Sequence, residues 1–311
     1  MILTNYWWML IWILGGGVLA IFVPKQQELV NGKKVERWTM PAALILILPY
    51  ILWAGFRSDN FGDTGAYQRA FRECASSFGK IGNYLSTVTK DKGFYLLMAL
   101  EKSILGDSYT LFFLLLAAFH LLMIMWMCRK YSEDYWFSIF LFVASTDYLS
   151  WTFNGIRQFT AVVIVYAATP FILKKKYIPS ILLVLLASTM HQSALLMIPI
   201  VLMIQGKAWN KKTVFCIFAS LAVLLFVDQF TNIMDSMLTE TQYKNVVGDY
   251  QAWNDDGTNP LRVFVYSIPA ILSLIGLKQI RAENDPIINI AAGAGAAACG
   301  LYIISRRPSG S

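Results

Sequence analysis

The chain has 311 residues, of which 57% are hydrophobic and only 14% are charged, and its mean hydropathy is +0.52. A soluble domain of this size carries about a quarter charged residues, so the composition excludes an ordinary soluble protein. The net charge of +7 comes without a basic run longer than three residues, which argues against a nucleic-acid partner. Long apolar runs without alternation predict an all-α fold, that of a polytopic helical integral membrane protein.

The apolar runs predict about 10 membrane segments. The first two cover 6–23 and 38–53. The run 93–105 is shorter than the about 20 residues that a span needs. Glu101 and Lys102 interrupt it, so we expect an interfacial or re-entrant helix there. The remaining segments are predicted at 109–127, 135–149, 159–173, 178–190, 194–204, 214–227, 263–277 and 287–304.

The distribution of basic residues predicts the orientation of the chain. If the loop 24–37 is cytoplasmic, alternation places every short basic loop on that side, including 174–176. The N-terminus then lies outside the cytoplasm, as do the polar segments 56–108 and 228–262. We expect residues 1–311 to form a single, multi-pass transmembrane domain.

Charge placement also predicts a broken helix around His191. A single long helix between Lys176 and Lys207 would place the lysine clusters at its two ends on opposite sides of the membrane. Two short legs with a turn at His191 keep both clusters inside. This arrangement predicts a broken-helix hairpin, with His191 at the bottom of an outward-facing cavity.

Polar residues on the predicted outer side form four clusters with the chemistry of a phosphate site. An arginine fork donates two hydrogen bonds to a phosphate and stays charged. A histidine or a carboxylate can accept a proton near neutral pH. The candidate residues are Arg57, Asp59, Asp63 and Tyr67; Asn154, Arg157 and Gln158; His191, Gln192 and Ser193; and Asn259 and Arg262.

Structural roles compete with each of these assignments. Arg57 can be a flank anchor, Arg157 can cap a helix end, and His191 can be a satisfied turn residue. His120, in mid-span without polar neighbours, is expected to be structural. The chain has no HExxH, no CxxC and no P-loop, and its four cysteines are far apart. We therefore expect no metal and no other cofactor.

Five runs, taken in order, resemble one protein family. They are RSDNFGDTGAY (57–67), NGIRQ (154–158), LLASTMHQSALLMIPI (185–200), NPLRVFVYSIPAIL (259–272) and GLYIIS (300–305). Together they are similar to the EpsG family of Wzy-like bacterial polysaccharide polymerases. The family continues past GLYIIS with a Gly-Arg-x-Pro-x-Tyr-Phe-like element. Here the tail, 290–311, is Ala/Gly-rich and ends in RRPSGS, so we expect it to be atypical or truncated, at a cost to activity.

The resemblance implies a membrane-embedded, metal-independent glycosyltransferase-like polymerase in the bacterial cytoplasmic membrane. It would join polyprenyl-diphosphate-linked oligosaccharide repeat units into exopolysaccharide or capsule at the outer face. Export and chain-length-control proteins are the further partners that this role implies. Arg157, with Arg57 or Arg262, would neutralise the departing diphosphate. His191 or Asp59 would take the acceptor proton. The sugars would be held by the remaining candidates, Asp63, Tyr67, Asn154, Gln158, Gln192, Ser193 and Asn259.

Three other functions compete with this interpretation. A flippase or transporter of lipid-linked sugars would also use arginines, but in a cavity open to both faces. A membrane acyltransferase that modifies polysaccharide would use a buried histidine approached from the cytoplasm. A scaffold subunit of an envelope complex would leave the polar clusters idle.

Overall fold

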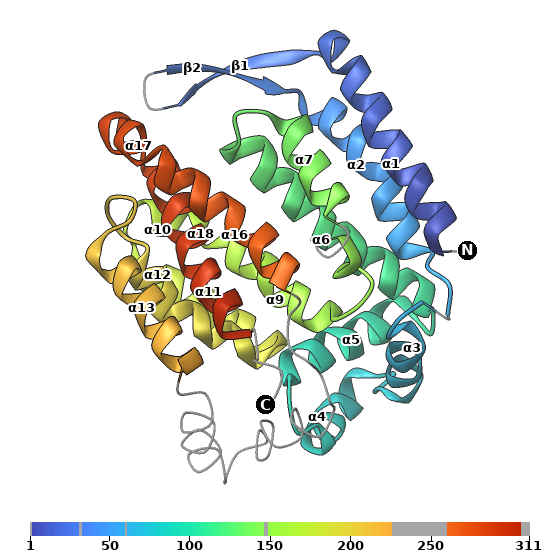
Figure 1. Cartoon of the computed structure of the whole chain (residues 1–311). Coiled ribbons are helices and arrows are strands. Elements are labelled where there is room, and N and C mark those ends of the chain that lie inside the picture. Colours follow the sequence, from blue (N-terminus) through green and yellow to red (C-terminus); the bar gives the residue numbers. More distant parts are fainter. Residues whose placement is uncertain (1, 31–32, 60, 146–148, 226–259, 306–311) are drawn as a thin grey trace. The chain divides into compact units, whose positions relative to one another are not determined.

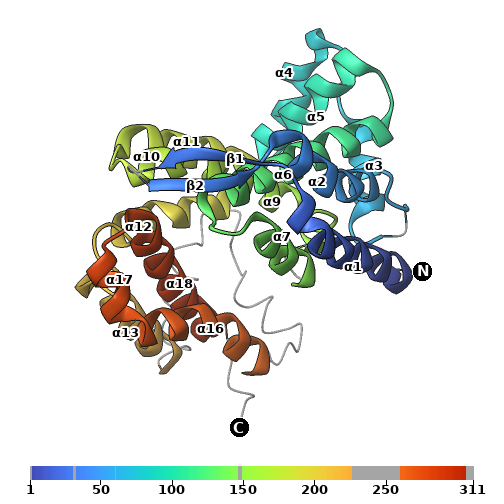
Figure 2. The ribbon, with the colours of Figure 1, turned by 90° about the horizontal axis from the view of Figure 1, so that it is seen from above.

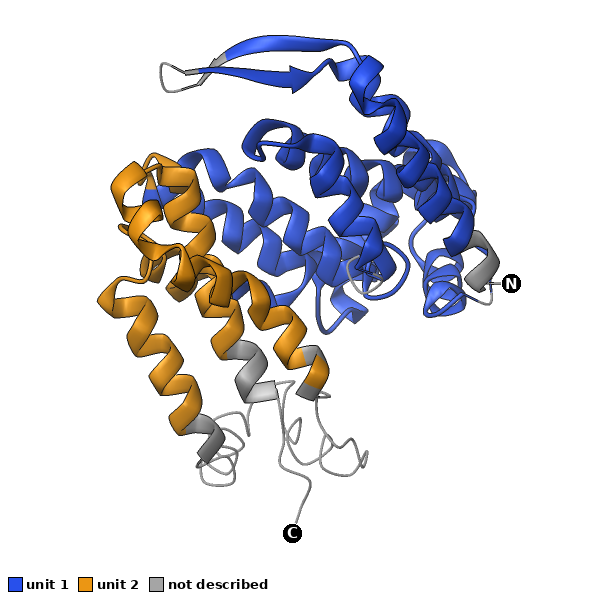
Figure 3. Ribbon diagram, turned by 45° about the horizontal axis from the view of Figure 1, so that its top comes forward, with its two compact units in different colours: residues 1–171, 177–195 blue, residues 172–176, 196–311 orange. Residues whose placement is uncertain are grey.

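The computed structural model describes residues 2–30, 33–59, 61–145, 149–225 and 260–305, and the described chain is mostly helical (Figure 1). It divides into two compact units (Figure 3). Unit 1 comprises residues 1–171 and 177–195, and unit 2 comprises 172–176 and 196–311. Helical secondary structure is confirmed for both units.

Unit 1 begins with α1 (Ile2–Leu19), the short 3-10 helix η1 (Ala20–Phe22) and a β-hairpin. Strands β1 (Lys25–Val30) and β2 (Lys33–Trp38) pair antiparallel, with Lys25 opposite Trp38 (Figure 2). The all-α prediction is wrong for this segment, which the sequence analysis treated as a loop. An Asn-Gly pair lies between the strands in the sequence, and this pair is a strong local signal for a hairpin.

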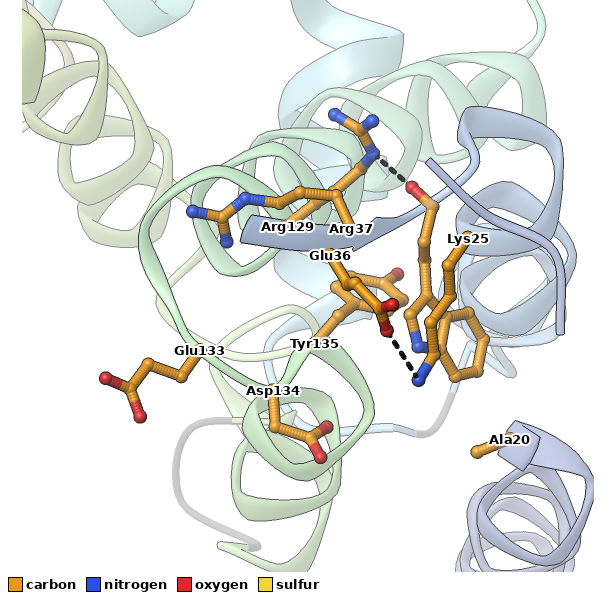
Figure 4. A pocket seen from close by; sticks show the side chains of 9 residues that line it. Ala20, Lys25, Glu36, Arg37, Arg129, Glu133, Asp134 and Tyr135 are labelled. Atoms are coloured by element: carbon orange, nitrogen blue, oxygen red, sulfur yellow. Dashed lines mark hydrogen bonds and ion pairs between the residues drawn. The ribbon is translucent and has the colours of Figure 1, made fainter. Parts of the chain in front are cut away.

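Arg129, near the end of α6 (Tyr109–Tyr131), connects the β-hairpin to the helices of unit 1 through hydrogen bonds. Its Nε donates to the carbonyl of Trp38 at 2.7 Å, and its Nη2 lies 2.8 Å from Oε1 of Glu28. A pocket of about 80 Å³ lies beside this junction, where Lys25 faces Glu36 at 3.7 Å (Figure 4). These contacts give the charged side chains around this pocket a structural role.

The apolar core of unit 1 lies among α1, α2 (Met40–Gly55), α6, α7 (Tyr135–Ala144) and α9 (Ile156–Ala167). Side-chain hydrogen bonds to backbone carbonyls lock these helices together. Tyr50 donates to the carbonyl of Met9 at 2.7 Å, and Trp12 donates to that of Leu46 at 2.9 Å. These two donors are therefore satisfied where their helices meet.

The polar stretch after α2 folds into three helices that gather on one side of unit 1 (Figures 1 and 2). They are α3 (Thr64–Glu73), α4 (Phe78–Thr87) and α5 (Lys92–Leu105). Lys102 is buried and donates to the carbonyls of Phe71 and Arg72 at 2.8 and 2.7 Å. The ammonium of Lys102 thus caps the carbonyl end of α3, and the interfacial position expected for the 93–105 helix stays a prediction.

Among the residues that the structure describes, two helices are long and apolar enough to cross a membrane, Tyr109–Tyr131 and Ile156–Leu173, and both match predicted segments. The pair Val263–Ile275 and Leu277–Glu283, bent by 63°, adds a third if it counts as one span. The other apolar helices in the described residues are shorter, including Tyr177–Met190, which is α11. The predicted number of about ten spans is therefore not confirmed.

The helix break expected at His191 is present. Helix α11 ends at Met190, and the 3-10 helix η2 (Gln192–Leu196) follows His191 directly. The next helix, α12 (Met197–Met203), belongs to unit 2, so the two legs are described separately.

Unit 2 packs α13 (Lys211–Leu225) and α16 (Pro260–Ile275) against α18 (Pro286–Ser305), with α17 (Leu277–Glu283) before α18. The Ala/Gly-rich run that the sequence analysis singled out lies in α18. Ala296 and Ala297 are buried there, and a Cβ at Gly300 would lie 2.8 Å from Oγ of Ser220 on α13. Small residues therefore permit close helix packing, as is common in membrane proteins.

Candidate active site

A buried carboxylate, Asp91, contacts both Arg157 and His191, two of the predicted site residues. Nη1 of Arg157 donates to Oδ2 of Asp91 at 2.8 Å. Nδ1 of His191 lies 3.5 Å from the same oxygen and has no closer hydrogen-bond partner among the described residues. The side chain of Asp91 is 3% exposed, whereas those of Arg157 and His191 are 24% and 29% exposed. The anion is therefore enclosed, and its two partners remain accessible.

Local backbone geometry brings these three residues together. Asp91 immediately precedes α5 and has left-handed backbone geometry, with φ 54°. Gly155, with φ 62°, caps α9 and leads into the helical turn that carries Arg157. His191 follows the last residue of α11. Left-handed backbone costs little for glycine and is tolerated by aspartate, so both turns suit their residues.

The close approach of α5 and α11 sets the distance between Asp91 and His191. A Cβ at Gly93 would lie 2.1 Å from Oγ1 and 2.6 Å from Cβ of Thr189. Only a residue without a side chain fits there. Gly93 therefore lets the start of α5 lie against the end of α11.

The charge of Asp91 is maintained despite its burial. Burial by itself would raise the pKa of this carboxyl, but the contact with His191, the charge of Arg157 and the backbone N–H of Gln192 outweigh it. The pKa of Asp91 is consequently held below its ordinary value. An ionised carboxylate at neutral pH can orient an imidazole and stabilise its protonated form.

Two tyrosines enclose the guanidinium of Arg157. Its Nε donates to the hydroxyl of Tyr67 at 3.3 Å, and its Cζ lies 5.9 Å from the ring centres of both Tyr67 and Tyr95. Burial raises the pKa of Tyr67, so its hydroxyl stays neutral and can accept this hydrogen bond. Within the described part of the chain, Nη2 of Arg157 makes no hydrogen bond, which leaves one donor nitrogen for a ligand.

Arg57 is a second, largely buried cation in unit 1. It donates to the carbonyls of Ala54 and Phe153 at 2.6 and 3.1 Å, and its Cζ lies 4.7 Å from the ring centre of Phe113. Burial lowers the pKa of Arg57 to about 10, which still leaves it charged at neutral pH. Its Nη2 is buried and has no partner among the described residues. A buried cation with an unused donor is costly unless an anion joins it.

Asp63 and Asn154 hold two loops together. Oδ1 of Asn154 accepts from the backbone N–H of Asp63 at 3.0 Å, and Oδ2 of Asp63 accepts from the N–H of Gly155 at 3.4 Å. Gly62, with φ 52°, lies so close that a Cβ there would be 1.5 Å from Oδ1 of Asn154. The reciprocal bonds give Asp63 and Asn154 a positioning role at the start of α9.

The other predicted site residues make no described contact with Asp91, apart from the backbone N–H of Gln192. Asp59 accepts a hydrogen bond from Gln68 at 2.5 Å, and no contact with Arg157 or His191 is found for it in the described residues. Gln158 and Ser193 are exposed, and Gln192 is half-buried. Asn259 lies outside the described residues, and Arg262 lies in α16 with its side chain undescribed.

Asp91 is the residue that sequence reasoning missed. The run Asp91-Lys92-Gly93 before an apolar segment is a signal for a helix N-terminus, but it gives no indication of a partner. His120 is fully buried, and its Nε2 lies 2.8 Å from Oγ1 of Thr160, in agreement with a structural role. No group of His, Cys, Asp and Glu in the described residues lies close enough to hold a metal ion.

Comparison with known proteins supports the family resemblance. No curated protein and no solved structure matches the chain. The sequence profile of the EpsG family matches residues 42–307, a range that includes Asp91, Arg157 and His191. Together with the apolar helices, this match indicates an integral membrane protein with an exopolysaccharide-polymerase-type role and a lipid-linked oligosaccharide substrate. The chain belongs to the EpsG family.

Proposed function

We propose that this protein polymerises polyprenyl-diphosphate-linked oligosaccharide repeat units at the outer face of the bacterial cytoplasmic membrane. The product is exopolysaccharide or capsular polysaccharide, and the reaction proceeds without a metal. The observation that carries the proposal is the Asp91 cluster: a buried carboxylate contacts a half-exposed arginine and a half-exposed histidine. This combination supplies a phosphate-binding group and a proton acceptor side by side.

The reaction is a displacement at the anomeric carbon of the donor sugar. The acceptor hydroxyl oxygen forms the new bond to that carbon, and the bond from the carbon to the diphosphate oxygen breaks. The electron pair leaves with the polyprenyl diphosphate. The hydroxyl proton goes to Nε2 of His191, whose Nδ1 faces Asp91 at 3.5 Å. Asp91 then stabilises the imidazolium, as a buried aspartate does in a hydrolase triad.

Arg157 is the group best suited to the departing diphosphate. Asp91 and Tyr67 fix two of its nitrogens, so the third is held in place before a substrate arrives. A preorganised donor of this kind contributes about 10²–10³ to the rate. Arg57 is the second candidate, because it has a buried donor and, among the described residues, no carboxylate in ion-pair contact.

Polar and aromatic side chains near Arg157 and His191 are the candidates for binding the sugars. Tyr95 presents its ring beside Arg157, and such amphipathic rings suit a sugar face that is apolar on one side. Gln158, Gln192 and Ser193 lie close in sequence to Arg157 and His191, and they supply donors and acceptors for hydroxyl groups.

The proposed orientation places segment 56–108 outside and the basic loops inside. It can be tested in intact cells with a membrane-impermeant thiol reagent, on a variant whose native cysteines are replaced. A cysteine at position 80 should react before lysis, and one at position 175 only afterwards. The reverse pattern would move the Asp91 cluster to the cytoplasmic side and refute a reaction at the outer face.

The decisive experiment supplies purified protein with a lipid-linked oligosaccharide and measures chain extension and release of polyprenyl diphosphate. Arg157→Ala should lower extension by about 10²–10³ while the protein stays folded in the membrane. Arg69→Ala removes an exposed arginine from α3 and serves as the matched control. Transport of the lipid across a bilayer without extension would establish a flippase instead, and acyl transfer to the sugar would establish an acyltransferase.

A further inference from the structure

Unit 2 contains a pocket of about 320 Å³ that the polymerase proposal does not use. It lies where the end of α10 (Thr169–Leu173), the turn after α12 and the turn between α17 and α18 meet. Lys175 and Lys207 line it, together with Gln205, Asn289 and the aliphatic side chains of Leu173 and Ile290. The lining therefore combines basic, polar and apolar side chains.

Three left-handed residues shape this pocket. Lys175, Gly206 and Asn284 have φ values of 54°, 107° and 53°, and each lies just beyond the end of a helix. Left-handed backbone is uncommon outside glycine, asparagine and aspartate, so its use at Lys175 is a specific feature of this turn. The reversals bring residues from three separate segments to one cavity.

Hydrogen bonds hold the pocket in shape before any ligand binds. The buried side chain of Asn289 accepts from the backbone N–H of Ala208 at 2.8 Å, which ties the turn after α12 to α18. Arg281 of α17 donates to the carbonyls of Ala208 and Trp209 at 3.2 and 3.1 Å. The lining is thus built by contacts that do not involve the ammonium groups of the two lysines.

The charge around the pocket is strongly positive. Neither Lys175 nor Lys207 forms an ion pair with another residue in the described ranges. Asp285, between the lining residues Asn284 and Pro286 in sequence, accepts from the N–H groups of Ile287 and Ile288 and so caps α18. The segments that meet here carry eight basic residues against two acidic ones. The basic residues are Lys174, Lys175, Lys176, Lys207, Lys211, Lys212, Lys278 and Arg281, and the acidic ones are Glu283 and Asp285.

We propose that this pocket binds the phosphate headgroup of an anionic phospholipid. The two ammonium groups contact the phosphate, and Leu173 and Ile290 contact the glycerol and the first part of the acyl chains. Its volume lies at the small end of the range for ligand pockets, which suits a small headgroup. Basic pockets at the cytoplasmic ends of membrane helices bind anionic lipid headgroups in this way.

A purely structural role for the lysines makes a different prediction. Cations near helix C-termini offset the helix dipole, and α10, α12 and α17 all end here. In that case the two lysines would contribute to folding but would not distinguish anionic from zwitterionic lipid. Lipid selectivity therefore separates the two roles.

The test is a calorimetric titration of the purified full-length protein in detergent with short-chain phosphatidylglycerol and, separately, phosphatidylcholine. Phosphatidylglycerol should bind and phosphatidylcholine should not. Lys175→Gln/Lys207→Gln should weaken phosphatidylglycerol binding by about 30-fold. Each lysine near an anionic lipid contributes about 1 kcal/mol, and a change of about 1.4 kcal/mol is a factor of ten in affinity. Lys211→Gln/Lys212→Gln removes the same charge nearby without touching the lining and should leave binding little changed.

Three outcomes would overturn the proposal. The first is equal binding of the two lipids, and the second is an equal loss in both double variants, which would show a diffuse charge effect. The third is displacement of phosphatidylglycerol by inorganic phosphate at a comparable concentration, which would assign the pocket to a soluble anion. Thermal unfolding of both variants without lipid checks that the pocket variant is folded.

Discussion

Asp91 and Arg157 form a 2.8 Å ion pair across 66 residues of sequence, and the carboxylate of that pair is almost completely buried. A buried anion requires a cation or several hydrogen bonds, so Asp91 depends on Arg157 and His191 for its charge. The dependence is mutual, because Asp91 fixes the arginine and faces the imidazole. The cluster therefore behaves as one unit, and the loss of any member should affect the others.

Asp91→Asn should abolish most polymerising activity. The amide keeps the size of the side chain but carries no charge to orient His191 or to stabilise its protonated form. We expect the rate of chain extension to fall by at least about 100-fold, the usual scale for general-base catalysis. Asp107→Asn is the matched control, since that carboxylate is 72% exposed at the end of its ion pair with Lys102. An Asp91→Asn protein with the rate of the control would remove Asp91 from the mechanism.

The same substitution should lower the stability of the protein by an amount that does not depend on pH in mildly alkaline solution. The pKa of Asp91 is held below its ordinary value of 3.8, so its contribution to the free energy of unfolding is complete above about pH 4. That contribution is lost only as the pH falls through the lowered pKa. The difference in melting temperature between the wild type and Asp91→Asn should thus be the same at about pH 8 and about pH 9, above the range in which histidines ordinarily titrate.

Arg157→Lys should be nearly as inactive as Arg157→Ala. A lysine retains the positive charge, but a single ammonium cannot bond Asp91 and Tyr67 and still offer a fixed donor to a phosphate. We expect the rate of diphosphate release to fall by about 10²-fold, with a melting temperature closer to the wild type than that of Arg157→Ala. If Arg157→Lys retained full activity, the site would need only a point charge and not the fork geometry of a guanidinium.

Gly93→Ala should separate α5 from α11. The added methyl group would lie 2.1 Å from Oγ1 of Thr189, so one helix end must move and carry Asp91 away from His191. We expect a loss of activity together with a lower melting temperature, because overpacking typically costs about 1–3 kcal/mol. Gly82→Ala is the control within α4, where a Cβ would meet nothing within 4 Å. That variant should be as active as the wild type and up to about 1 kcal/mol more stable, since alanine favours a helix.

The parts of the fold that follow from local chemistry were predictable from the sequence. The segment predicted at 109–127 is helix α6, which begins at Tyr109 and ends at Tyr131. Arg129, in its last turn, bonds to Trp38 and Glu28. The break at His191 followed from the placement of the lysine clusters alone. Both features depend on hydrophobicity and charge along the chain, which periodicity and the positive-inside rule capture.

The parts that depend on distant partners could not be predicted in this way. Asp91 is one carboxylate in a polar stretch, and only the fold shows that it lies beside Arg157 and His191. From the sequence, Lys102 is a lysine in a short apolar segment. Only the fold shows that its ammonium donates to two carbonyls at the end of α3. Asp59, a candidate base by its proximity to Arg57 in sequence, contacts Gln68. Whether a polar side chain acts in a site or in a cap is thus decided by tertiary contacts.

Glu101 provides a test of the fold of α5 that is independent of activity. Its Oε2 is buried without a hydrogen-bond partner in the described residues, and burial raises the pKa of this carboxyl to about 7 from an ordinary value of 4.5. The folded protein therefore binds this proton more tightly than the unfolded chain does. The associated stability is fully present below about pH 4.5 and is lost as the pH rises through about 7.

Glu101→Gln should consequently stabilise the protein at about pH 8, where the wild type has to hold a buried carboxylate, and have less effect at about pH 5. The measurement is the melting temperature of the wild type and the variant in detergent at both pH values. Glu73→Gln, an exposed residue at the end of α3, is the matched control. A stabilisation of Glu101→Gln that is larger at the acidic pH would contradict the sign of this argument and the burial of Glu101 in α5.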